Sequence, residues 1–297
     1  MIINLAAFAD VAVQAAVRGE LIQLLSAGSL PMHPSLLYMG SINGKGTDVL
    51  RQAFIGWGGY DRMTPVGEGV AIADTALTLD TVDLQPVRHG LARTATDIAK
   101  IVDPLGVVNV QMLAQDALGS YMETLAAKIA PLSGGFSNTV GTGSADLSLA
   151  TFVAGQNDCD ARGVRGPLLS MLHPVAFGHL RAELVGATNG WIAGTQELIQ
   201  RLGSNYKGNF LGTDIVTHSD CPSTSNYKGG IFGRGAIVWG DGATDLSDVD
   251  GAVSIAGLVS LEKDRDGRRG KTSYISAAWL AATEGRDDFG TTFISQL

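Results

Sequence analysis

The chain has 297 residues, enough for one large domain or two smaller ones. Hydrophobic residues make up 45% and charged residues only 17%, which favours a globular protein with a weakly charged surface. Such a surface fits a protein that is largely covered by further copies of itself, and it fits a compact enzyme equally well. The net charge of -8 argues against a dedicated nucleic-acid binder, which needs a basic face to displace counterions.

Two features bear on the cellular compartment. Cys159 and Cys221 lie far apart and lack the spacing of a metal or redox motif, so we expect no disulfide framework and a reducing cytosol. No basic segment precedes the apolar start at Met1, no small-residue cleavage site follows it, and no apolar run approaches the roughly 18 residues of a membrane span. The sequence therefore predicts a soluble intracellular product.

The first predicted element is an amphipathic helix over residues 5–25, where apolar residues recur at helical spacing. The stretch 26–29 and Pro31 end it. A helix this short is marginal alone in water, so its apolar face must dock. It docks either on its own domain or on a neighbouring subunit or scaffold.

A long hairpin is predicted next. Residues 41–69 are rich in glycine and indicate loops with short elements. Alternating apolar and polar residues then predict two strands, 70–73 and 77–84, that pair with each other. The hairpin has no aromatic anchor, and an isolated two-stranded hairpin is marginal. We therefore expect this arm to find its partner on another subunit.

The longest predicted helix starts with Asp103 as N-cap and Pro104 at the first helical position. It should run to about Ile129 and stop at Pro131 and the glycine pair 134–135. At about 1.5 Å per residue, such a helix is about 40 Å long.

A Gly/Ser-rich linker over residues 133–146 then leads into a small α/β lobe, in which Asp146 caps a short helix. The further elements predicted for this lobe are helices at 175–186 and 195–202, strands at 168–172 and 213–217, and short glycine-broken strands within 210–222 and 227–243. The remaining chain is β-rich: strands at 252–261 and 272–281 flank a charged turn at 263–271, and residues 271–297 form strand, turn and strand.

Glycine-rich and acidic motifs were compared with known ligand loops. Residues 43–47 and 141–144 begin like phosphate loops, but neither completes GxxxxGK[ST] or GxGxxG between a strand and a helix. Residues 264–267 resemble the start of a calcium loop. The bidentate glutamate is missing, however, and Arg265 and Arg268 would repel a cation. We interpret all three as loops or turns.

No arrangement for nucleophilic or metal chemistry is predicted. The sequence has no GxSxG elbow, and neither cysteine lies in a protease signature. His173 and His179 are six positions apart with Pro174 between them, so they are not a metal pair, and His173 is expected at a strand end. The paired carboxylates are expected in solvated loops: Asp158 with Asp160, and Asp287 with Asp288. We therefore predict no catalytic, cofactor-binding or metal-binding residue.

The order of these elements resembles the shell-forming domains of tailed-phage major capsid proteins of the Hong Kong 97 type. The most specific local match is MLHPVAFGHLRAEL, residues 171–184, which is similar to a strand-His-Pro-helix passage in such proteins. The resemblance implies an α+β fold with an N-terminal arm, an E-loop hairpin, a peripheral domain with a long spine helix, and an axial domain. The implied boundaries are 1–40 for the arm, 41–62 for the first peripheral part, 63–85 for the E-loop, 86–145 for the part with the spine helix, 146–248 for the axial domain, and 249–297 for the returning peripheral strands.

The resemblance also implies a function. Copies of such a protein self-assemble into pentamers and hexamers of an icosahedral shell around a double-stranded DNA genome, in a virion capsid assembled in the host bacterial cytoplasm. It implies no enzyme activity and no cofactor. The implied partners are further copies, with a scaffolding protein, portal and decoration proteins as candidates, and packaged DNA contacted non-specifically on the inner face; no membrane is involved.

Some members of this family weld subunits through an E-loop lysine and a peripheral-domain asparagine. Residues 63–85 contain no lysine, so the resemblance implies a shell held by non-covalent contacts. The arm is too short for a cleavable scaffolding segment, so a separate scaffolding protein or the arm itself would guide assembly. Two alternatives stay open: an encapsulin-type nanocompartment shell, which packages enzymes, and a small α/β hydrolase or transferase.

Overall fold

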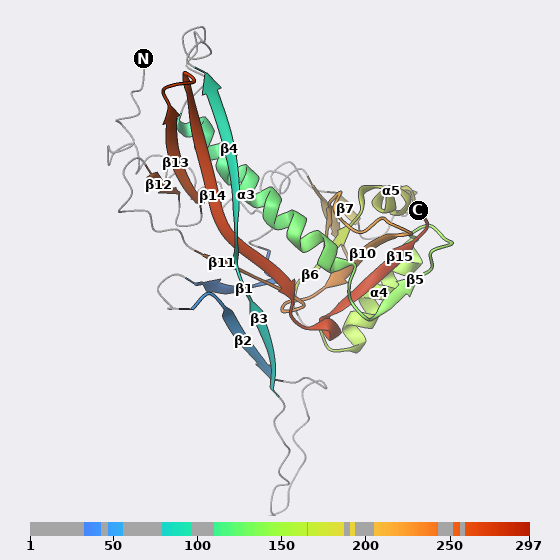
Figure 1. The fold of residues 1–297 in the computed structure, drawn as a ribbon. Helices are drawn as coiled ribbons and strands as arrows, with labels where there is room; N and C mark the ends of the chain where they lie inside the picture. The colour runs from blue at the N-terminus through green and yellow to red at the C-terminus, as the bar shows by residue number, and fades with distance from the viewer. Residues whose placement is uncertain are drawn as a thin grey trace, which may run out of the picture.

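The computed structural model describes residues 33–42, 47–55, 79–96, 110–164, 166–186, 191–193, 205–242, 252–255 and 259–297. These residues form two large sheets and a two-stranded ribbon, with one long helix across the strands (Figure 1). Several predictions lie outside the described residues: the helix at 5–25, the strand at 70–73, the phosphate-like residues 43–46, the helix start at Asp103, and the helix at 195–202. No described helix is both long and apolar enough to cross a membrane.

The first sheet is organised around its longest strand, β14. Its order is β1-β11-β14-β13-β12, and β4 also pairs with β14. β1 and β11 are parallel, and the other pairs are antiparallel. The strands are β1 (Leu36–Ser41), β4 (Val87–Thr96), β11 (Ile237–Gly242), β12 (Ala252–Ile255), β13 (Val259–Asp266) and β14 (Lys271–Glu284). The predicted β-rich stretch 272–281 lies in β14 and is confirmed. The stretch 252–261 is divided between β12 and β13, which pair antiparallel with each other.

The second sheet has seven strands in the order β5-β15-β10-β6-β9-β8-β7. Its strands are β5 (Thr139–Gly141), β6 (Leu168–Leu172), β7 (Trp191–Ala193), β8 (Tyr206–Phe210), β9 (Thr213–Thr217), β10 (Tyr227–Phe232) and β15 (Gly290–Ser295). The helices α4 (Leu149–Ala161) and α5 (Pro174–Gly186) share a buried cluster with one face of this sheet, through residues such as Phe152, Leu180 and Phe293. The predicted strands β6 and β9 and the helix α5 are confirmed.

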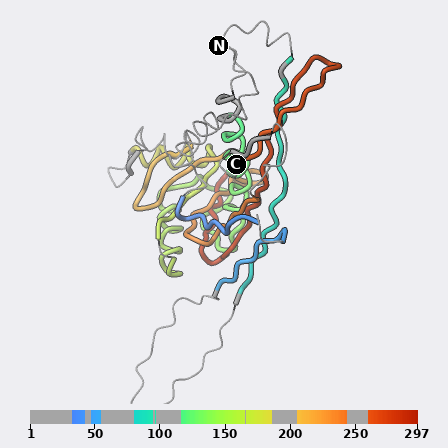
Figure 2. The backbone as a smooth tube through the Cα atoms, turned by 90° about the vertical axis from the view of Figure 1, so that its left-hand side faces the viewer, coloured from blue at the N-terminus to red at the C-terminus, as the bar shows by residue number. Residues whose placement is uncertain are grey.

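Helix α3 (Val110–Ser133) joins the two sheets. Its 24 residues make it about 36 Å long. Leu125, Ile129 and Ala130 are fully buried, and the same hydrophobic cluster contains Phe232 of the seven-stranded sheet and Leu280 of the six-stranded sheet. Because α3 buries apolar surface against both sheets, they form one continuous body around it (Figure 2).

Two helix boundaries differ from the predictions. α3 continues through Pro131 to Ser133, and its last turn is closed by hydrogen bonds from Gly134 N to Pro131 O at 3.3 Å and from Gly135 N to Leu132 O at 3.0 Å. Proline removes one hydrogen bond, which costs less in a final turn that is already tightening. The N-cap of α4 is Ser148 rather than Asp146: the Ser148 side chain accepts the Thr151 N–H at 3.2 Å.

The predicted strand 77–84 has a described partner that the prediction did not include. The strand β3 (Leu79–Leu84) pairs antiparallel with β2 (Leu50–Ile55), which lies in the stretch interpreted as glycine-rich loop. β2 has the sequence LRQAFI, which does not alternate apolar and polar residues, and glycines lie on both sides of it, so no strand pattern marks it. We call β2 and β3 together the ribbon. It lies at one end of the molecule, and the β13–β14 hairpin lies at the other (Figures 1 and 2).

Neither large sheet is built from one contiguous segment of the chain. β11 lies within residues 146–248 but belongs to the six-stranded sheet. β15 lies within residues 249–297 but pairs with β10 of the seven-stranded sheet. β5 pairs with β15 and so belongs to the same sheet. The chain therefore crosses between the two sheets more often than a division into contiguous segments implies.

Candidate functional site

The phosphate-like residues 141–144 form the turn between β5 and α4. Gly141 has φ +93°, and a Cβ added there would collide with the carbonyl oxygen of Ile294. A Cβ on Gly143 would collide with the Asn226 side chain. Contacts inside the chain thus account for these glycines, and the loop interpretation needs no bound phosphate.

Of the calcium-like residues 264–267, the first three end the strand β13 and Gly267 begins the turn to β14, so the turn is shorter than the predicted 263–271. The Asp266 carboxylate accepts the backbone N–H groups of Arg268 at 3.1 Å and Arg269 at 3.2 Å. The Arg269 side chain lies 3.6 Å from the same carboxylate. Asp266 therefore closes the turn in the usual way of aspartate, which supports the turn interpretation.

The two histidines of the His-Pro-helix passage have separate partners. His173 stacks on Tyr227 with ring centroids 4.5 Å apart, and its Nδ1 accepts the Val175 N–H at 3.3 Å. Burial lowers the pKa of His173. His179 Nδ1 instead lies 3.2 Å from the Asp146 carboxylate. Among the described residues, no three His, Cys, Asp or Glu side chains gather as metal ligands.

Both cysteines are free and buried. Burial raises the pKa of the Cys221 thiol to about 12, and it also raises the pKa of Cys159. The thiolate is the reactive form of cysteine, so neither thiol is suited to nucleophilic chemistry at neutral pH.

The prediction that Asp158 and Asp160 lie in a loop is wrong, because both lie in α4. Asp160 is exposed, whereas Asp158 accepts hydrogen bonds from Arg162 Nη2 at 2.6 Å and Thr291 Oγ1 at 2.8 Å. The contact between Asp158 and Thr291 could not be predicted from sequence spacing, because Thr291 lies in a strand 133 positions further along the chain. Asp158 therefore serves to hold α4 against β15.

The other predicted pair lies at the joint between the sheets, where the short 3-10 helix η3 (Asp287–Phe289) links β14 to β15. Asp287 Oδ1 accepts the Ser137 N–H at 2.7 Å, just beyond the end of α3. Burial, then the hydrogen bond and charge of Asp287, raise the pKa of Glu284 to about 7. Burial alone would raise the pKa of Asp287, but hydrogen bonds from Ser137 and Glu284 and the charge of Arg162 lower it. The two carboxyl groups therefore share one proton near neutral pH.

This pair leads to a prediction about pH. A carboxyl pKa raised on folding favours the native state below it, so stability should fall as pH rises from about 4.5 to about 7 and then level off. Because Glu284 is partly solvated, we expect the free energy of unfolding to fall by about 1–2 kcal/mol over this pH range. Urea unfolding of wild type and Glu284→Gln at pH 5 and pH 8 measures it. Glutamine keeps a donor toward Asp287 and should lose less stability between the two values; equal pH dependence in both would contradict the shared proton.

A buried cluster that the sequence did not indicate fixes the start of β1. His33 Nε2 lies 3.0 Å from Asp214, and His33 Nδ1 accepts the Ser35 N–H at 3.2 Å, so the proton on Nε2 faces the carboxylate. Tyr206 and Asn209 donate to the other Asp214 oxygen at 3.0 and 2.9 Å. The cluster ties β1 of one sheet to β8 and β9 of the other.

The ribbon is seated on β11. Leu50 and Leu84 are cross-strand partners and are both buried. A Cβ on Gly240 would lie 2.5 Å from Leu50 Cδ1 and 2.9 Å from Leu84 Cδ2, so a larger residue there would force these two side chains to shift. Arg286 from the joint stacks over Phe54 of β2, 5.0 Å from the ring centroid. The base of the ribbon is thus held by the same joint that carries Glu284.

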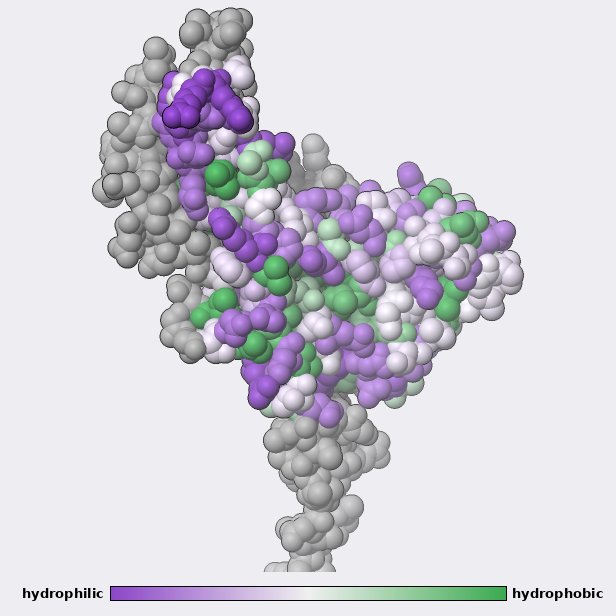
Figure 3. Space-filling view, in the orientation of Figure 1, coloured by the Kyte–Doolittle hydropathy of each residue, from purple (hydrophilic) through white to green (hydrophobic). Residues whose placement is uncertain are grey.

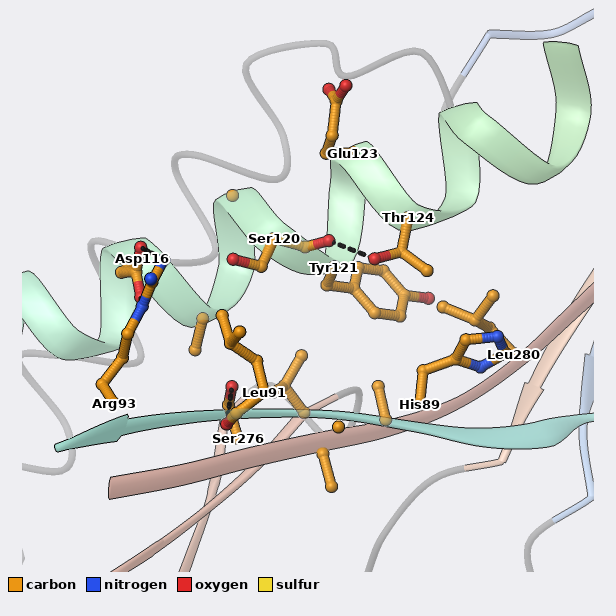
Figure 4. A pocket seen from close by; sticks show the side chains of 16 residues that line it. His89, Leu91, Arg93, Asp116, Ser120, Tyr121, Glu123, Thr124, Ser276 and Leu280 are labelled. Atoms are coloured by element: carbon orange, nitrogen blue, oxygen red, sulfur yellow. Dashed lines mark hydrogen bonds and ion pairs between the residues drawn. The ribbon is translucent and has the colours of Figure 1, made fainter. Parts of the chain in front are cut away.

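An open groove of about 640 Å³ lies between α3 and the strands β4 and β14 (Figure 4). Leu91, Tyr121 and Leu280 give it an apolar lining. At one end Arg93 of β4 reaches Asp116 of α3 through two hydrogen bonds of 2.9 and 3.0 Å. These two charges neutralise each other, and Glu123 adds a further carboxylate to the lining.

The sequence matches no protein-family model and no curated protein. The structure, by contrast, is similar to solved phage capsids. The capsid of Ralstonia phage GP4 is 10% identical with a TM-score of 0.61, covering 92% of this chain and 89% of that one. The head of Helicobacter pylori bacteriophage KHP40 is 9% identical with a TM-score of 0.58, covering 92% and 90%. A Mycobacterium phage Che8 structure is 14% identical with a TM-score of 0.51, covering 83% and 84%.

These likenesses extend over most of each chain. The protein therefore has a mixed α/β fold similar to those of the solved phage capsids, and the resemblance seen in the order of elements is confirmed at the level of the fold.

Proposed function

We propose that this chain is a major capsid protein whose copies assemble into the pentamers and hexamers of an icosahedral shell around a double-stranded DNA genome. The observation that carries the proposal is the fold likeness to phage capsids over 83% to 92% of the chain. On this proposal the role is structural rather than enzymatic. The protein resides in the virion capsid after assembly in the host bacterial cytoplasm.

The parts of the fold then take the following roles. Residues 63–85 form the E-loop, α3 is the spine helix, and residues 1–40 form the arm that ends in β1. The six-stranded sheet belongs to the peripheral domain and the seven-stranded sheet to the axial domain. On this proposal β11 belongs to the peripheral domain, although it lies within residues 146–248. β5 and β15 belong to the axial domain, although they lie outside that range.

Contacts between copies are proposed to be non-covalent, because residues 63–85 contain no lysine for an isopeptide bond. Many weak contacts, each given and received by every copy, stabilise a closed shell even though no single one is strong. A scaffolding protein, a portal, decoration proteins and non-specifically contacted DNA are the further proposed partners.

The test shortens the E-loop without disturbing its base. Ile55 and Leu79 are paired at the end of the ribbon, so an Asn-Gly turn can replace residues 56–78 and close it as a two-residue hairpin. We expect this variant to fold with the thermal unfolding midpoint of wild type but to form no shells. Negative-stain microscopy and light scattering of the purified chains measure assembly.

A matched variant carries a Gly/Ser segment of equal length in place of residues 56–78, which separates loop length from loop side chains. It should also fail to assemble. Normal particles from the shortened variant would contradict the E-loop assignment, and a monodisperse dimer or tetramer of wild type under all conditions would contradict the capsid proposal. Shells that package enzymes rather than DNA would favour a nanocompartment.

A further inference from the structure

The side of β11 that faces α3 carries polar groups in a mostly apolar interior. On the outer face seen in Figure 3, hydrophilic residues lie between small hydrophobic patches and are solvated. Trp239 and Asp241, by contrast, are two residues apart on a buried strand, so their side chains share one face of the sheet. Trp239 belongs to the hydrophobic cluster around α3, and Asp241 is only 1% exposed. A carboxyl group this deeply buried costs stability unless its oxygens are hydrogen-bonded.

The two oxygens of Asp241 differ in their surroundings. The Tyr38 hydroxyl donates a hydrogen bond to Oδ1 at 3.0 Å. A bulge in β1 places residues 39–40 opposite Gly240 alone and brings Ser41 beside Asp241. Burial raises the pKa of Asp241, and hydrogen bonds from Tyr38 and Ser41 offset part of this rise. Oδ2 is buried and has no hydrogen-bond partner among the described residues.

A second buried group approaches Asp241 from α3. Tyr121 is 4% exposed, and its hydroxyl has no hydrogen-bond partner in the part of the chain that the structure describes. Burial, then the charges of Asp241 and Tyr38, raise the pKa of Tyr121, so its hydroxyl lies within electrostatic reach of the carboxyl group. Figure 4 shows this hydroxyl on the side of Leu280, the cross-strand partner of Asp241. Trp239 Nε1 is likewise buried without a described partner.

We propose that a water molecule is bound between α3 and β11, where it accepts the Tyr121 O–H and donates to Asp241 Oδ2. Buried water typically makes about three hydrogen bonds, and the Trp239 Nε1–H offers a further donor on the same face of β11. Water fits better than a metal ion, because no three His, Cys, Asp or Glu side chains gather among the described residues. Gly240, between Trp239 and Asp241, faces the ribbon on the opposite side. The water therefore links α3 to the strand on which the ribbon is seated.

Removing the Tyr121 hydroxyl tests the bridge by the sign of its effect. Tyr121→Phe should lower the equilibrium constant for folding about tenfold, because the water and Asp241 lose part of their hydrogen bonding. A hydroxyl without any partner would give the opposite sign, since its removal ends the cost of burying it. Tyr274→Phe is the matched control: this hydroxyl is also buried without a described partner, but burial is the one cause that raises its pKa. Urea unfolding of the full-length unassembled subunit should show the control unchanged or more stable.

A high-resolution density map of the full chain identifies the occupant directly. We expect a single peak within hydrogen-bond distance of Tyr121 Oη and Asp241 Oδ2, and its loss in Tyr121→Phe. Direct contact between the two side chains with no peak between them would overturn the inference. So would a peak with the many close oxygen ligands of a metal ion, or a more stable Tyr121→Phe variant. The inference does not depend on the proposed function, because the site lies inside one subunit, and neither result bears on whether copies assemble.

Discussion

Replacing Arg162 by alanine is expected to lower the free energy of unfolding by about 2–3 kcal/mol, because several hydrogen bonds to a half-buried carboxylate and to backbone carbonyl groups are lost together. The Arg162 side chain is only 20% exposed. Its guanidinium donates to Asp158 and Thr291 and to the backbone carbonyls of Asp288 at 2.6 Å and Gly290 at 3.0 Å. Without it, a half-buried carboxylate and two carbonyl groups at the joint lose their partners.

Urea unfolding of the unassembled subunit, followed by circular dichroism, measures this loss. Arg162→Lys keeps the charge but cannot form the fork, so it should fall between alanine and wild type. Arg181→Ala, at an exposed position of α5, is the control and should change stability by less than about 0.5 kcal/mol. A loss below about 1 kcal/mol for Arg162→Ala would show that the network contributes little to holding α4 on β15.

Local patterns were sufficient to predict single elements where burial and turn residues agree. The run Leu168–Leu172 is buried at every position, and the His-Pro pair after it begins α5, so both elements are confirmed. The same reasoning failed at β2, whose six residues are flanked by glycines, and at the end of α3, where proline is tolerated in the last turn. Pairing between strands was not accessible, because β11 and β15 are assigned to their sheets by contacts remote in sequence.

The polar clusters of the candidate site were beyond the reach of spacing rules for the same reason. His33 and Asp214 are 181 positions apart, and Arg162 meets Thr291 across 129 positions. The hydrophobic period of α3 does predict a buried face, and Asp116 and Glu123 mark its polar side. Only the fold shows that Asp116 meets Arg93 of β4 across the open groove.

The second large effect is expected at Gly230, in the middle of β10. A Cβ there would collide with the backbone carbonyl oxygen of Ser133 and lie 3.2 Å from the carbonyl oxygen of Thr291. β10 pairs with β6 and β15 on its two sides, and Ser133 is the fully buried last residue of α3, so neither side can move freely. Gly230→Ala should therefore destabilise the subunit by about 3 kcal/mol or more, as severe overpacking of a core does.

The measurement is again urea unfolding, and Gly178→Ala is its matched control. Gly178 lies in α5, and an added Cβ there meets no described atom within 4 Å, so alanine should stabilise the subunit by up to about 1 kcal/mol. If Gly178→Ala raises the free energy of unfolding and Gly230→Ala lowers it, the effect of helix propensity is separated from the effect of close packing. If Gly230→Ala proved as stable as wild type, the end of α3 could not lie as close to β10 as the structure places it. The attachment of α3 to the seven-stranded sheet would then have to rest on other contacts.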